Sequence, residues 1–293
     1  MKVLVIGATG MLGRPAVRRL LADGHDVTGL ARNDDRAAAV AGQGITPVIG
    51  DLFDASSLLG ALAGQEAVLN LATRIPTPGK AALGMGWAEN DRIRSVGSTT
   101  LVDAALRSGD VRIIVQEGVS FYYADGGDTE ITEESPIDVP ANLRSTIEAH
   151  ENVARFAGEG RIGVRLRIGG LVGDDPMTRT LRSGARFGIP VTFGDAAGWT
   201  VAVHPSDAAA GAVAALAAPT GVYNVGATPL RKRDLGAVLA GTHKPHSVPP
   251  GLLRLMGPAA SLGRSQRVVS RKLTEATGWQ PALPTVSAEW FRQ

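Results

Sequence analysis

The chain begins with Val3-Leu4-Val5-Ile6, and Gly-Ala-Thr-Gly-Met-Leu-Gly follows at positions 7 to 13. Four consecutive apolar residues predict a strand that is buried on both faces, and the amphipathic stretch after the glycines predicts a helix beginning near Met11. Gly7 permits the unusual backbone angles of a tight turn, Gly10 lets the backbone approach a pyrophosphate, and Gly13 allows close packing of the helix on the strand. The N-terminus of this helix would bind the phosphates of a dinucleotide.

A glycine-rich turn can also be only a tight corner between a strand and a helix. The context favours nucleotide binding, because a second predicted strand at residues 26–30 follows at the distance that a βαβ unit requires. We therefore expect a dinucleotide at this turn.

Further strand-like runs occur at residues 46–49, 67–71, 112–115 and 163–168, and helical patterns lie between most of them, for example at 98–106 and 144–157. This alternation predicts an α/β fold with a doubly wound parallel (Rossmann) sheet. The pattern becomes irregular after Gly169. We expect a dinucleotide-binding domain at residues 1–168 and a smaller C-terminal substrate-binding lobe at 169–293, whose segment at about 200–220 packs back on the first domain.

Composition excludes several other functions. The 293 residues are 44% hydrophobic, no apolar run is long enough to span a membrane, and Met1-Lys2 leads directly into the first strand, so we expect a cytoplasmic protein. The formal charge of +2 gives no indication of nucleic-acid binding. The chain has no cysteine, and its five histidines lack metal-site spacing, so thiolate catalysis is excluded and no metal centre is expected.

Six motifs resemble those of the extended short-chain dehydrogenase/reductase family, which contains nucleotide-sugar epimerases and dehydratases. They are Gly7 to Gly13, Gly50-Asp51-Leu52, Asn70-Leu-Ala-Thr73, Val203-His-Pro-Ser-Asp207, Tyr223-Asn-Val-Gly226 and Thr277-Gly-Trp-Gln-Pro281. The resemblance covers nearly the whole chain. It implies that Asp51 contacts adenine, that residues 70–73 close the fourth strand, and that residues 223–226 form a strand of the substrate domain.

The glycine motif and the resemblance together indicate a set of cofactor-binding residues. They are Gly7, Thr9, Gly10, Met11, Leu12, Gly13, Arg14, Arg32, Asn33, Asp51, Leu52, Leu71, Ala72 and Thr73. Where NAD-binding proteins carry an acid after the second strand, this chain has Arg32, which suits the 2′-phosphate of NADP, and Arg14 and Arg36 could join it. NAD is the alternative, because Asp34 and Asp35 lie nearby, and Arg32 could merely cap the sheet edge in solvent.

The catalytic positions of the resembling family are altered. The family carries a Tyr-x-x-x-Lys pair, a serine and an asparagine, and this chain has Leu143, Ile147, Val119 and Arg94 at those positions. No Tyr-x-x-x-Lys occurs anywhere in the sequence. Because leucine and isoleucine cannot exchange protons, the usual acid–base mechanism is absent.

Replacement groups are expected just after the fifth strand, where Glu117, Ser120 and Tyr123 occur. Arg94 and Glu117 could polarise a substrate group, or they could form a buried ion pair that orients a helix. Tyr123 could be the replacement acid if its phenol lies near Arg94, or it could fill the wall between the domains. We expect His150 to face solvent.

The sequence favours an atypical NADP-dependent oxidoreductase or epimerase-like enzyme that acts on a polar small molecule, either a nucleotide sugar or a secondary metabolite. Arg179, Arg182 and Arg186 share one helix face that could hold a diphosphate or could be a solvated stripe. One alternative is a non-redox isomerase, cyclase or lyase that keeps the dinucleotide as a structural group. Another is a catalytically inactive NADP(H) sensor or binding protein. A homodimer is possible.

Overall fold

A parallel sheet of seven strands forms the centre of the protein, whose computed structural model describes residues 1–77, 80, 85–253 and 260–291. The strands are β1 (Lys2–Ile6), β2 (Asp26–Ala31), β3 (Thr46–Ile49), β4 (Ala67–Asn70), β5 (Ile113–Gln116), β7 (Ile162–Ile168) and β12 (Gly221–Val225). Their order is β12-β7-β5-β4-β1-β2-β3, and all neighbours are parallel. The predicted doubly wound sheet is confirmed, with its change of winding direction between β1 and β4.

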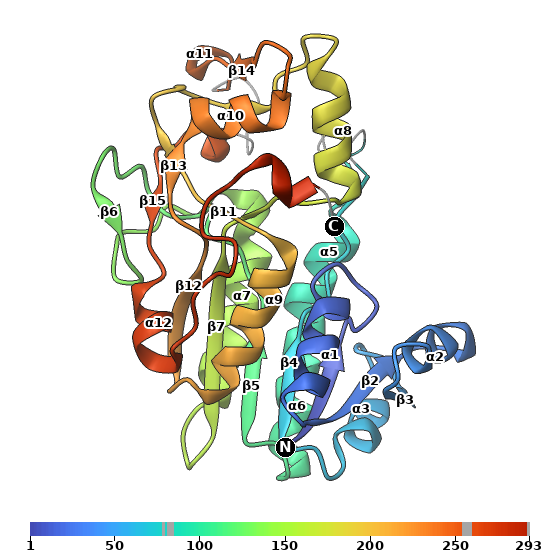
Figure 1. Ribbon diagram of the computed structural model, residues 1–293. Helices are drawn as coiled ribbons and strands as arrows, with labels where there is room; N and C mark the ends of the chain where they lie inside the picture. The colour runs from blue at the N-terminus through green and yellow to red at the C-terminus, as the bar shows by residue number, and fades with distance from the viewer. Residues whose placement is uncertain (78–79, 81–84, 254–259, 292–293) are drawn as a thin grey trace.

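Helices cover both faces of this sheet (Figure 1). On one face α1 (Gly13–Ala22) packs against α9 (Pro205–Ala214), and on the other α6 (Ser98–Ser108) lies between α3 (Ala55–Leu62) and α7 (Arg144–Phe156). Successive residues of β1 point to opposite faces, so Val3 and Val5 enter the first core while Leu4 and Ile6 enter the second. All four are at most 3% exposed, which explains why this strand has an unbroken apolar sequence.

The remaining elements are short. They are α2 (Asp34–Ala41), α5 (Ala88–Arg92), a π-helix η1 (Ile93–Gly97), β6 (Glu130–Ile131), η2 (Ala141–Leu143), β8 (Gly170–Leu171), α8 (Pro176–Ala185), β9 (Thr192–Phe193), β10 (Trp199–Thr200), β11 (Ala202–Val203), η3 (Ala215–Ala217), β13 (Leu230–Arg231), α10 (Lys232–Ala240), β14 (Ser247–Val248), α11 (Pro250–Leu253), β15 (Arg267–Val268), α12 (Arg271–Thr277) and η5 (Ala288–Phe291). A lobe containing α8, α10 and α11 lies beyond the carboxyl ends of the sheet strands (Figure 1).

Part of the C-terminal half belongs to the main sheet. After β11 the chain returns to pack α9 on α1, and it then adds β12 to the sheet beside β7, with Tyr223 opposite Leu166. The expectation that residues 223–226 form a substrate-domain strand is therefore wrong, because Tyr223 to Val225 complete the edge of the dinucleotide-binding sheet. Within the described residues, no helix combines the length and apolar character that crossing a bilayer requires.

Candidate active site

A cleft of about 620 Å³ opens along the carboxyl ends of β1, β2, β4 and β5. This volume lies in the usual range for sites that bind cofactors and small molecules. Most of the predicted cofactor residues line it: Gly7, Thr9, Gly10, Met11, Leu12, Arg32, Asp51, Leu52, Leu71, Ala72 and Thr73. Of the predicted catalytic residues, Arg94 and Glu117 line it as well.

The glycine loop packs too tightly for side chains at two of its positions. Gly7 has a φ of +85°, and a Cβ added to it would lie 2.9 Å from the Ala72 Cα atom. A Cβ on Gly13 would lie 2.0 Å from the Gly7 carbonyl oxygen. The loop therefore lies against the chain just after β4 and leads into α1. Residues Thr9 to Leu12 line the cleft, which is the arrangement that binding of a dinucleotide diphosphate requires.

Three residues of the predicted cofactor set do not line the cleft. Gly13 serves the packing of α1 on the loop. The Arg14 Nε atom donates a hydrogen bond to the Thr9 carbonyl oxygen at 3.1 Å. Asn33 caps α2, because its Oδ1 atom accepts a hydrogen bond from the Arg36 amide at 3.0 Å. These three residues stabilise the backbone that surrounds the cleft and do not line it themselves.

Two guanidinium groups line the cleft at the end of β2, on Arg32 and Arg36. Arg32 lies 4.0 Å from Glu89, a long contact between exposed side chains. Asp34 and Asp35, which favoured NAD in the sequence, occupy the first turn of α2 and do not line the cleft. Carboxylates at that position stabilise the N-terminus of the helix. This end of the cleft therefore carries two arginines, and among the described residues only Arg32 has a carboxylate partner, the distant Glu89.

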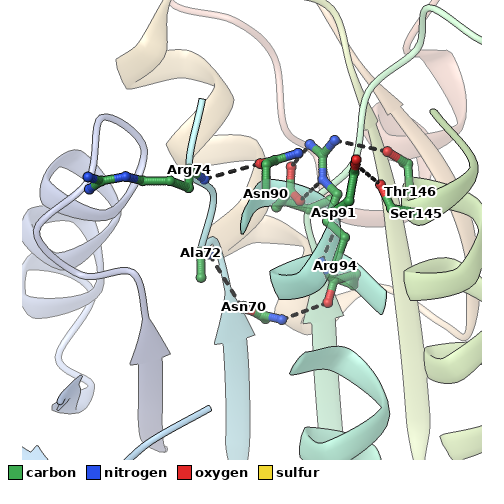
Figure 2. Close-up of polar contacts among 10 residues, drawn as sticks. Asn70, Ala72, Arg74, Asn90, Asp91, Arg94, Ser145 and Thr146 are labelled. Atoms are coloured by element: carbon green, nitrogen blue, oxygen red, sulfur yellow. Dashed lines mark hydrogen bonds and ion pairs between the residues drawn. The ribbon is translucent and has the colours of Figure 1, made fainter. Parts of the chain in front are cut away.

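Arg74 lines the cleft just beyond β4, although the sequence did not single it out. Its amide donates a hydrogen bond to Asn90 Oδ1 at 3.1 Å, and Asn90 is only 1% exposed. The guanidinium of Arg74 extends away from the polar cluster around Arg94 (Figure 2). The backbone of Arg74 is thus fixed while its charged group remains exposed to the cleft.

The inner end of the cleft contains a buried ion pair. Arg94 donates from Nε and Nη2 to the two carboxylate oxygens of Glu117, each at 2.9 Å, and from Nη1 to Thr146 Oγ1 at 3.0 Å. The two side chains are 3% and 4% exposed. Burial has the largest single effect and lowers the pKa of Arg94, but Glu117 together with Asp91 and Tyr122 outweighs it, so the pKa is raised and Arg94 stays charged. The expected pairing of Arg94 with Glu117 is confirmed.

The π-helix η1 places Arg94 at this position. A π-turn inserts an extra residue into a helix and is frequent at functional sites. Here Gly97 closes the turn, and a Cβ added to it would lie 2.8 Å from a Leu52 methyl group. Asp91, one turn earlier, accepts a hydrogen bond from Ser145 at 2.7 Å (Figure 2). Residues 90–94 therefore connect the end of β4 to α7.

Of the two roles left open for Tyr123, the structure agrees with the buried, hydrogen-bonded position and not with an acid beside Arg94. Its side chain is fully buried, its hydroxyl donates to Asn224 Oδ1 at 2.7 Å, and its ring lies beside the Arg167 guanidinium rather than Arg94. Burial raises the pKa of Tyr123, which is opposite to the shift that an acid catalyst needs. Ser120 is also fully buried and lies outside the cleft lining. Neither residue presents a proton to the cleft.

His150 does not face solvent as expected. It is buried, its Nδ1 atom lies 3.3 Å from the Tyr122 hydroxyl, and its Nε2 atom lies against the Gly118 backbone. Burial lowers the pKa of His150 to about 3, so the imidazole is neutral. The helical spacing of Thr146, His150 and Val153, all buried on α7, was the sequence signal that could have placed it.

The positions at which the sequence resemblance expected a Tyr-x-x-x-Lys pair fall at the start of α7. Leu143 ends the short η2 turn and Ile147 lies in the first turn of α7, and both are half-buried. Between them Thr146 accepts the hydrogen bond from Arg94. At the inner end of the cleft, α7 therefore contributes the Thr146 hydroxyl, which accepts a hydrogen bond from Arg94.

Comparison with known proteins identifies the family. The NAD(P)H-binding family model matches residues 7–158, just over half of the 293-residue chain. A 3-diazoavenalumate denitrifying reductase from a Streptomyces species is 30% identical over 97% of both chains. The photosystem II assembly factor Ycf39 of Cyanophora paradoxa is 44% identical, but over only 26% of this chain and 24% of its own.

Solved structures show the same fold. The dTDP-glucose 4,6-dehydratase DesIV of Streptomyces venezuelae, with NAD bound, aligns with a TM-score of 0.76 at 21% identity and covers 99% of this chain and 95% of its own. The human epimerase family protein SDR39U1, with NADPH, aligns with a TM-score of 0.75 at 24% identity and covers 98% and 97%. The chain belongs to the NAD(P)H-binding family and has the Rossmann fold of the extended short-chain dehydrogenases/reductases.

Proposed function

We propose that the protein is an NADP(H)-dependent reductase of a small organic molecule. The observation that carries this proposal is the layout of the cleft, which runs from two guanidinium groups at β2 over the glycine loop to a chamber bounded by Arg94 and Glu117. The full-length similarity to a reductase supports the reaction type. When bound, NADPH would supply a hydride.

Each end of the cleft has its own task. Arg32 and Arg36 would bind the 2′-phosphate, since guanidinium groups recognise phosphates through charge-assisted hydrogen bonds. Asp51 and Leu52 would flank the adenosine, and the glycine loop would hold the diphosphate. The Arg94–Glu117 pair would form a fixed wall of the substrate chamber, because both carboxylate oxygens already accept hydrogen bonds.

The surroundings of α8 do not favour a nucleotide-sugar substrate. Arg179 pairs with Asp174 at 3.1 Å, and Arg182 stacks over the Phe291 ring at 3.9 Å. Two of the three arginines that could hold a sugar-linked diphosphate therefore have partners within the protein. A substrate without a diphosphate fits better, such as the diazo compound for which the Streptomyces relative is named.

Cofactor titration and turnover test this proposal. Following nicotinamide fluorescence, we expect NADPH to bind at least ~10-fold more tightly than NADH, and Arg36→Ala to remove most of that preference. Incubation with 3-diazoavenalumate should consume NADPH. Tighter binding of NADH would refute the cofactor assignment. Binding of NADPH without consumption by any acceptor would favour the sensor, which the four altered family positions already support.

A further inference from the structure

The inner end of the cleft has a distinctive lining. Apolar side chains of Leu71, Ile93, Val119, Ile168 and Leu171 surround the backbone of two glycines, at positions 118 and 169. A Cβ on Gly118 is excluded because it would lie 2.3 Å from His150 Nε2, and a Cβ on Gly169 would press on Val201 at 3.1 Å. Flat backbone between apolar side chains suits a planar, largely apolar group.

The charged groups at this end are already fully engaged with each other. Arg94 and Glu117 share two hydrogen bonds, and Thr146 accepts a third from Arg94. At 3% and 4% exposure the pair presents almost no surface to a substrate. Because the arginine stays charged, its proton is not available to a reacting atom.

The three tyrosines of the chain are committed elsewhere. Tyr122 accepts a hydrogen bond from Arg167 at 2.7 Å, Tyr123 donates to Asn224, and Tyr223 donates to the Pro219 carbonyl oxygen at 2.9 Å. Burial raises the pKa of all three. No lysine or histidine occurs among the described residues that line the cleft. Of the residues outside the described set, none is a tyrosine, histidine, lysine or acid.

These features constrain the acceptor. Reduction of an aldehyde or ketone places negative charge on oxygen, which needs a positioned acid or preorganised donors. A cationic carbon acceptor needs neither. With an iminium ion, the C–H bond of the reduced nicotinamide breaks, its electron pair forms a new C–H bond, and the C=N π pair moves to nitrogen. With an arene diazonium ion, the C–N electron pair leaves with N₂ as the new C–H bond forms.

We infer that the substrate is a planar, largely apolar molecule that accepts hydride at a cationic carbon centre and takes no proton from the protein. This inference rests on the proposed reductase function and adds the substrate class to it. The wall formed by Arg94 and Glu117 supplies a fixed dipole within an apolar chamber, and the substrate supplies the electrophile.

The test compares acceptors of similar size and different charge. The cyclic iminium ion 2-methyl-3,4-dihydroisoquinolinium and the ketone 1-tetralone are each incubated with the protein and NADPH that carries deuterium at C4. Menadione, a neutral quinone, serves as a general hydride acceptor. We expect deuterium in the amine product and a value of kcat/KM at least ~100-fold above that for tetralone, since a missing general acid costs about that factor.

A second measurement does not depend on turnover. In the NADP⁺ complex, which has no hydride to transfer, 2-methyl-3,4-dihydroisoquinolinium should raise the melting temperature more than neutral tetralone does. Faster reduction of tetralone, or no stabilisation by the cation, overturns the substrate class. Reduction of menadione alone overturns it while the reductase function stands. If NADPH binds and neither these three acceptors nor 3-diazoavenalumate is reduced, the reductase function itself is refuted.

Discussion

Replacing Arg94 by methionine tests whether the Arg94–Glu117 ion pair has the energetic cost of a buried pair when one partner is removed. Arg94→Met keeps the length of the side chain but removes both donors to Glu117 and the donor to Thr146. The Glu117 side chain, only 4% exposed, would remain as an uncompensated charge. Breaking a buried pair in this way typically costs about 3–5 kcal/mol. At roughly 2–4 °C per kcal/mol, the melting temperature should fall by about 6–20 °C.

The assay is thermal and urea unfolding of the protein without cofactor near neutral pH, with two comparison variants. Arg155→Met breaks the pair with Asp103, whose side chains are 46% and 43% exposed, and should cost less than ~1 kcal/mol. The double variant Arg94→Met/Glu117→Met removes both charges and should recover most of the lost stability. The reasoning is refuted if Arg94→Met costs no more than Arg155→Met, or if the double variant is less stable than Arg94→Met alone.

Three further outcomes are expected. Arg74→Ala should weaken NADPH and NADH binding equally, by about 10-fold, whereas Arg36→Ala should weaken only NADPH; titration of both cofactors distinguishes them. His150, with a pKa of about 3, stays neutral in the folded state but gains a proton when the protein unfolds below its ordinary pKa. The free energy of unfolding should therefore fall as the pH drops from about 6.5, by about 2 kcal/mol at pH ~5. In urea unfolding, His150→Gln should show a smaller fall over the same pH range. Tyr123→Phe should cost about 1–3 kcal/mol because the buried Asn224 Oδ1 atom loses its donor, while turnover persists. Loss of turnover in a folded variant would restore Tyr123 as a catalytic candidate.

The sequence predicted the dinucleotide half of the fold well because its signals are local. A buried strand, a glycine turn and an amphipathic helix each follow from a few adjacent residues. The pairing of Arg94 with Glu117 was also predictable, because the end of a strand and its preceding helix meet at the same edge of the sheet.

The errors came from contacts between distant segments. The acid role considered for Tyr123 required it beside Arg94, but its partner Asn224 lies 101 residues away on β12, a strand that the sequence assigned to the other lobe. His150 was expected in solvent because Glu151 is its neighbour, yet the loop carrying Tyr122 covers it. Strands and helices of only a few residues show weak hydrophobic periodicity. The sequence near such an element therefore does not indicate which distant segment its side chains contact.

The segment at residues 90–94 explains how the two halves of the cleft depend on each other. Asn90 fixes the backbone of Arg74 at the cleft, while Arg94 is held at the inner end of the cleft by Glu117 and Thr146 (Figure 2). Each helical residue turns the chain by about 100°, so the extra residue of the π-helix changes the direction in which the following side chains point. This rotation allows Asn90 and Arg94 to reach their respective partners. A fixed ion pair exchanges no protons, but it holds this geometry rigidly. An ion pair that orients and does not transfer protons fits the proposed substrate, which brings its own electrophile.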